Sequence, residues 1–147
     1  MSDLDTILKN TLKGVTEKFD TARHDLHEQV AKLAKAVQSV TDGMASVELV
    51  PSTNPATNNE KAILYHLSFF SPGQGERRAL KNLRISMDGY PISVTTQDPP
   101  EVANIQNRQQ LEEMMQKMVS GKDSSLVAMI AFVLRNKAIS TVESIPA

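Results

Sequence analysis

The strongest pattern in the chain is a stripe of non-polar residues over its first 44 positions. They recur at alternating steps of three and four, with one extra four-residue step between Leu26 and Val30. This repeat is typical of a helix that packs along another helix, and the extra step locally unwinds a left-handed supercoil. The stripe consists of Leu8, Leu12, Val15, Phe19, Ala22, Leu26, Val30, Leu33, Val37, Val40 and Met44.

A helix of this length is too long for the rest of the chain to cover. Roughly 40 residues at about 1.5 Å per residue extend about 60 Å, twice the width of a small domain. Either the helix breaks near Gly14 and folds back, or its stripe packs against copies of itself, and we favour self-association. The number of copies and the helix direction stay open. The expected oligomer interface comprises Leu8, Leu12, Val15, Phe19, Leu26, Val30, Leu33 and Val37.

The pattern changes to that of β-strands after residue 44. A short strand at 45–50 precedes a loop at 50–60 that is rich in Pro, Asn, Ser and Thr. Residues 61–70 then alternate apolar and polar side chains at period two, which predicts a second strand.

A hairpin is predicted for residues 83–96. The dipeptide Asp88-Gly89 favours a two-residue type I′ turn, in which both residues have positive φ. Pro91 follows closely and has no N–H to donate to a neighbouring strand. We therefore expect the strand at 90–96 to be an edge of the sheet.

Two helices are predicted to close the chain. Asp98 is suited to cap a short helical turn, and a longer helix is expected at about 105–119. A second helix follows a cap at Asp123 or Ser124, and its residues 126–136 are apolar almost all round. A helix of that kind is expected to be largely buried.

Together these elements predict an α+β fold. A long, coiled-coil-like N-terminal helix precedes a small antiparallel sheet of three or four strands and two C-terminal helices. The expected division is an oligomerisation helix at 1–44, a short strand and linker at 45–60, and an α+β interaction module at 61–147.

Composition narrows the classes of partner. The net charge is −1, so no overall field attracts nucleic acid or an anionic membrane, and nucleic acid is disfavoured as a partner. The longest apolar run, 126–134, is far shorter than the ~20 residues of a membrane span. Cysteine is absent, which excludes disulfides, thiolate zinc sites and a cysteine nucleophile. We expect a cytoplasmic protein without a membrane partner.

The segment SPGQGERRALK at 71–81 has two glycines ahead of a basic cluster. Its spacing fits neither a P-loop nor a dinucleotide fingerprint, and it lies between two predicted antiparallel strands. We therefore favour a turn followed by solvated charges. The alternative is a site for a small anionic ligand or nucleotide formed by Arg77, Arg78, Lys81 and Arg84.

Histidines and methionines supply the other candidates. His24 and Glu28 share a helix face, but they lie off the apolar stripe, which indicates a solvated face rather than a metal site. His66 in the second strand is interpreted as a structural histidine. Because aromatic residues make up only 4 % of the chain, methionines at 114, 115, 118 and 129 are expected to fill the core. An adaptable partner-binding groove is the open alternative.

No set of residues in the sequence resembles catalytic machinery. There is no nucleophile motif, no carboxylate pair in an evident cleft and no glycine-rich elbow. We therefore expect a non-enzymatic protein without cofactor or metal, which associates with itself and acts as an adaptor or inhibitor by binding another protein. Binding of a small anionic ligand through the 71–84 segment is the second hypothesis.

Overall fold

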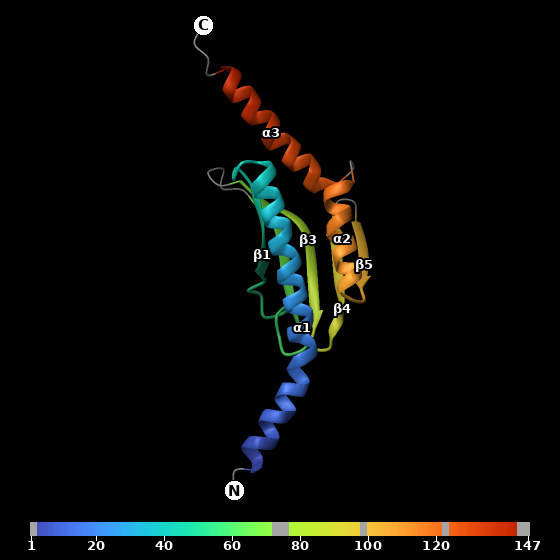
Figure 1. The fold of residues 1–147 in the computed structure, drawn as a ribbon. Helices are drawn as coiled ribbons and strands as arrows, with labels where there is room; N and C mark the ends of the chain where they lie inside the picture. Colours follow the sequence, from blue (N-terminus) through green and yellow to red (C-terminus); the bar gives the residue numbers. More distant parts are fainter. Residues whose placement is uncertain (1–2, 72–76, 98–99, 122–123, 144–147) are drawn as a thin grey trace.

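The elements of the fold follow one another in a simple order along the chain. The computed structural model describes residues 3–71, 77–97, 100–121 and 124–143. The elements are α1 (Asp3–Val40), β1 (Ser46–Pro51), β2 (Ala62–Phe70), β3 (Arg77–Ser86), β4 (Gly89–Gln97), β5 (Pro100–Ile105), α2 (Arg108–Ser120) and α3 (Ser125–Glu143) (Figure 1). The predicted α+β architecture is confirmed, although the sheet has five strands rather than three or four.

The five strands form one antiparallel meander in the order β1-β2-β3-β4-β5. Tyr65 of β2 pairs with Leu83 of β3, which in turn pairs with Val94 of β4. Because side chains alternate between the faces of a sheet, these three residues lie on the same face. All three are buried, so this face forms the floor of the core.

Helices α1 and α2 cover that face of the sheet (Figure 1). The buried apolar side chains of α1 recur at helical spacing from Phe19 onward. They are Phe19, Ala22, Leu26, Val30, Leu33 and Val37. Among the described elements, no helix packs on the opposite face of the sheet.

The prediction of an edge strand at 90–96 is wrong. Strand β5 pairs with the outer side of β4, from Ile92 opposite Ile105 to Gln97 opposite Pro100. Pro91 comes just before the first paired residue, so its missing N–H removes no hydrogen bond from the ladder. The helical turn expected from Asp98 onward is also wrong, because β5 begins at Pro100; Asp98 itself lies outside the described residues.

The hairpin between β3 and β4 forms where the sequence predicts it, with a different turn. Gly89 has a φ of 80° and pairs with Ser86, so Met87 and Asp88 make the turn. Among the described non-glycine residues only Asp42 has positive φ, which excludes the type I′ turn expected for Asp88-Gly89. The pairing register shifts between Arg84 and Ser86, which is the irregularity expected of a bulge beside a glycine.

The two C-terminal helices begin at side-chain caps. The Asn107 side chain accepts a hydrogen bond of 2.9 Å from the Gln110 amide at the start of α2. Ser124 accepts one of 3.4 Å from the Val127 amide at the start of α3, which confirms one of the two expected caps.

Helix α3 differs from its prediction. Leu126 and Val133 are buried, whereas Phe132 and Leu134 are exposed, so the helix is not largely buried. It leaves the body beyond α2 and passes the end of α1, where Lys137 pairs with Asp42 at 2.9 Å (Figure 1). Only its first turns meet the core, because the sheet does not extend beneath the rest of the helix.

Candidate functional site

The N-terminal part of α1 presents apolar side chains that no described residue covers. The helix continues without a break through Gly14 and extends beyond the sheet (Figure 1). Five apolar side chains on this part are between 50 % and 80 % exposed. They are Leu4, Ile7, Leu8, Leu12 and Val15, and we call them the projecting stripe.

The structure divides the eight residues expected at an oligomer interface into two groups. Three of them, Leu8, Leu12 and Val15, belong to the projecting stripe. The other five are buried against the chain's own sheet and helices, so a second copy does not reach them in this fold. These five are Phe19, Leu26, Val30, Leu33 and Val37.

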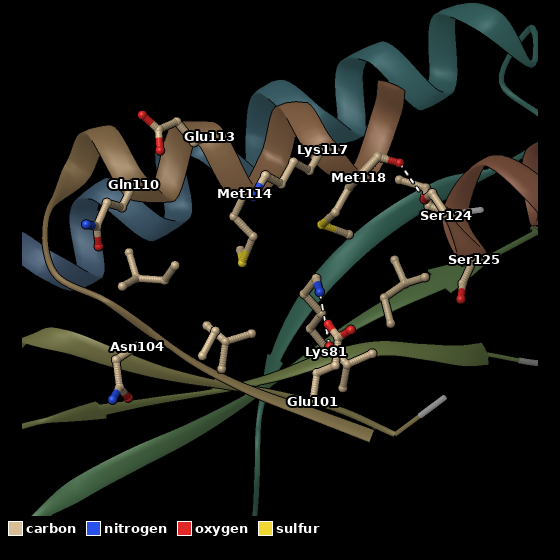
Figure 2. A pocket seen from close by; sticks show the side chains of 16 residues that line it. Lys81, Glu101, Asn104, Gln110, Glu113, Met114, Lys117, Met118, Ser124 and Ser125 are labelled. Atoms are coloured by element: carbon tan, nitrogen blue, oxygen red, sulfur yellow. Dashed lines mark hydrogen bonds between the residues drawn. The ribbon is translucent and has the colours of Figure 1, made fainter. Parts of the chain in front are cut away.

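A groove of about 620 Å³ lies between the sheet and α2, close to the start of α3 (Figure 2). Figure 2 shows Met114 and Met118 pointing from α2 toward the sheet, with Lys81 and Glu101 on the strands opposite them. Leu80, Val94, Ile105 and Leu126 add apolar surface, and Gln110, Glu113 and Lys117 add polar groups. An apolar groove with a few polar groups at its walls is typical of a binding site.

Lys81 is the most buried basic group of this groove. Its amino group donates a hydrogen bond of 3.0 Å to the Thr96 hydroxyl. Burial lowers the pKa of Lys81 below its ordinary value, and the negative charge of Glu101 opposes that shift. The groove therefore contains one partly desolvated cation beside an acidic residue, and it has no pronounced charge of one sign.

The four basic residues of the anionic-ligand hypothesis do not converge. Lys81 lines the groove on the helix side of the sheet. Arg84 is exposed and points to the opposite face, because it lies between the buried Leu83 and Ile85 in β3. Arg77 pairs with Glu48. Arg78 is exposed at the start of β3.

Arg77 has a second contact: its guanidinium lies 5.2 Å from the centre of the Phe70 ring. The chain therefore already supplies this arginine with an anion and an aromatic face. The glycine-containing part of the predicted turn, residues 72–76, lies outside the described residues.

A partly buried polar cluster at the junction of α1, α2 and the β3–β4 hairpin was not predicted from the sequence. The Tyr90 hydroxyl donates a hydrogen bond of 2.7 Å to Asp25, which also lies 3.6 Å from the Arg108 guanidinium. Arg108 contacts Glu28 at 3.0 Å and Glu112 at 3.2 Å. Burial, the hydrogen bond to Asp25 and the charge of Asp25 raise the pKa of Tyr90, so its hydroxyl remains a donor.

This cluster is a structural joint, because each of its charged groups has a partner within it. The only available signal in the sequence was an acidic residue next to Leu26, on the side of the helix that faces the core. Neither Tyr90 nor Arg108 could be assigned to it from local pattern, since both come from distant elements.

The three histidines have three different environments. His24 is exposed and lies 3.8 Å from Glu28, as expected for a solvated helix face. The His27 ring packs edge-on against Tyr65, and burial, followed by the charges of Arg23 and His24, lowers its pKa. Within the described residues, no group of three or more His, Cys, Asp or Glu side chains could hold a metal ion.

His66 has a partner that the sequence did not reveal. Its Nδ1 lies 2.7 Å from the Asn82 side-chain oxygen, on the paired residue of the neighbouring strand. That contact orients the imidazole and accounts for its position on the sheet.

The methionines lie both in the core and along the groove. Met115 is part of the buried core, and Met129 packs against the core. Met118 is buried and also borders the groove, and Met114 is half-buried on the groove wall. The core and the groove therefore share the same helix.

Comparison with known proteins adds no relative to this description. The chain matches no protein-family model, and no curated protein and no solved structure resembles it at a significant level. None of the helices within the described residues combines the length and the apolar character needed to cross a membrane.

Proposed function

We propose that this chain is a non-enzymatic interaction protein that associates with itself through α1 and binds a second protein through its α+β body, as an adaptor or inhibitor does. The observation that carries the proposal is the projecting stripe. Monomeric proteins rarely expose contiguous apolar surface unless it meets a partner.

The energetics of the projecting part of α1 support a partner. A helix of about 15 residues without tertiary packing is marginally stable in water. This one contains Gly14 and three threonines, at positions 6, 11 and 16, which are weak helix formers. Fully burying a Leu, Ile or Val side chain contributes about 1.5–3 kcal/mol, so a partner over the stripe would stabilise the helix strongly.

The groove beside α2 is the proposed site for the second protein. Its methionine side chains are flexible and polarizable, and they adapt to differently shaped apolar partners. The polar groups Lys81, Glu113 and Lys117 on its walls offer hydrogen bonds to a bound segment of either charge.

Self-association is tested with a pair of substitutions that each add one negative charge to the projecting helix. Leu12→Glu alters the stripe, and Asn10→Glu is the matched control, two residues away and on the other side of the helix. Sedimentation or light scattering at tens of micromolar is expected to give an oligomer for the wild type and the control, and a monomer for Leu12→Glu. Circular dichroism should show that the body is folded in all three proteins.

A wild-type protein that is monomeric under these conditions would refute self-association. Equal dissociation of both variants would also count against the stripe, because it would show that added charge alone disrupts the assembly.

A further inference from the structure

We infer that the projecting stripe pairs with the same stripe of a second copy in the antiparallel direction, which gives a closed dimer with the two bodies at opposite ends. This inference rests on the proposed self-association and specifies its geometry. Three observations carry it: the position of the body along α1, the spacing of the stripe, and the distribution of charge.

The position of the body excludes a parallel pair in register. The projecting stripe continues along the same side of α1 into Phe19, Leu26 and Leu33, as the heptad spacing requires. From Phe19 onward this side is occupied by the chain's own sheet (Figure 1). Two parallel copies that face each other along their stripes would bring both sheets into the same space.

An antiparallel pair avoids this collision. The helix of the second copy ends near the point where the body of the first begins, because the uncovered stripe stops at Val15 and the covered side starts at Phe19. The hairpin tip marks this boundary, since Gly89 packs directly against the Lys18 carbonyl. The stretch of α1 that is available for contact with an antiparallel partner is therefore the projecting part itself.

The apolar positions of the projecting stripe are spaced almost identically when counted from either end. A two-fold axis between residues 9 and 10 places Leu4 opposite Val15 and Ile7 opposite Leu12. The same axis places Leu8 opposite Thr11, whose hydroxyl is already bonded to the Ile7 carbonyl at 2.8 Å. A self-complementary surface of this kind suits the isologous contact of a two-fold dimer.

The distribution of charged residues along α1 also favours the antiparallel direction. Asp3 and Asp5 make the first turn acidic, and residues 9–18 carry three lysines against one glutamate. Antiparallel copies bring each acidic turn level with the basic part of its partner, whereas parallel copies align like charges. The helix dipoles are also opposed in the antiparallel pair, which is the favourable arrangement.

Disulfide trapping tests the direction, and the natural chain is suited to it because it has no cysteine. Two full-length single variants are prepared, Leu4→Cys and Val15→Cys, one of them with a size tag. The two positions are about 16 Å apart along one helix, far beyond the Cα separation of about 4.4–6.8 Å that a disulfide allows. Each variant is oxidised alone and in an equal mixture, after circular dichroism has shown that its body is folded.

The antiparallel dimer predicts a disulfide between the two variants in the mixture, at least about ten-fold more than either variant forms alone. Efficient disulfide formation by each variant alone would overturn the antiparallel direction while self-association stands. If no disulfide forms but the wild type sediments as a dimer, the stripe is not the dimer contact and the inference fails. A monomeric wild type would overturn both the inference and the proposed self-association.

Discussion

Tyr90 and Asp25 connect the β3–β4 hairpin to α1 through one hydrogen bond of 2.7 Å. Asp25 is buried on the same side of α1 as its apolar neighbours, and it remains there because Tyr90 and Arg108 both face it. A buried carboxylate without partners would be strongly unfavourable. This joint therefore fixes how the helix lies on the sheet.

Tyr90→Phe tests the joint, because it removes the hydroxyl and retains the ring. We expect the free energy of unfolding to fall by about 1–3 kcal/mol, since a buried acceptor loses its donor. Urea denaturation measures the change. Tyr65→Phe is the control: its hydroxyl accepts from Arg23, which is exposed and can bond to water instead, so a loss below about 1 kcal/mol is expected. Equal losses in the two variants would contradict a special role for Tyr90.

At the scale of an element, the hairpin shows how packing selects among turns that the sequence permits. Asp88-Gly89 predicts a tight turn, and a turn forms there with Gly89 at positive φ. The tip lies against α1, where a Cβ on Gly89 would overlap the Lys18 carbonyl. Glycine is thus required at this position by backbone conformation and also by close approach to the helix.

Two glycines with nearly the same φ separate these requirements. Gly43 has a φ of 79° with open space around it, whereas Gly89 has a φ of 80° and faces the Lys18 carbonyl. Gly43→Ala should cost about 1–2 kcal/mol, the strain of the left-handed conformation alone. Gly89→Ala should cost clearly more, because the hairpin tip must also move away from α1. Similar losses of melting temperature in the two variants would mean that the contact with α1 is unimportant.

At the scale of the whole molecule, α1 serves two purposes with one continuous pattern. Its residues 19–37 cover the sheet, and residues 4–15 extend beyond it. The heptad repeat does not change at residue 19. The boundary is set by the length of the strands and the position of the hairpin tip, which are properties of the folded body.

Two truncations test this division. A chain that begins at residue 17 keeps every buried residue of α1, so it should fold with nearly the wild-type melting temperature and be monomeric. A chain that begins at residue 45, where the sequence indicated a domain boundary, would expose the apolar face around Leu67, Leu83 and Ile92. We expect it to aggregate or to lack a cooperative transition in calorimetry. A cooperative transition in this shorter chain would show that α1 is not part of the core.

The elements that the sequence predicted well are those with local causes. The period of 3.6 in α1, the period of two in β2 and the glycine of the hairpin each depend on neighbours in the chain. The strand β5 was missed because its six residues, PEVANI, have a weak pattern, and their hydrogen-bond partners lie on β4. The candidate surfaces divide in the same way. The apolar residues of the projecting stripe are visible in sequence, whereas the sequence indicates only the methionines of the groove and not its strand side.

The sequence by itself determined that α1 is a long helix with one apolar side, since helical spacing alone places those residues together. Only the tertiary structure decided what covers that side. Burial of apolar surface is non-directional, so the same stripe is satisfied equally by a sheet or by a second helix. The alternation of β3 by itself places Lys81 and Arg84 on opposite faces of the sheet, whereas the shift of its pairing register opposite Leu67 and Ser68 was decided by its contact with β2. Contacts between residues distant in the chain made that choice, and no local pattern encodes them.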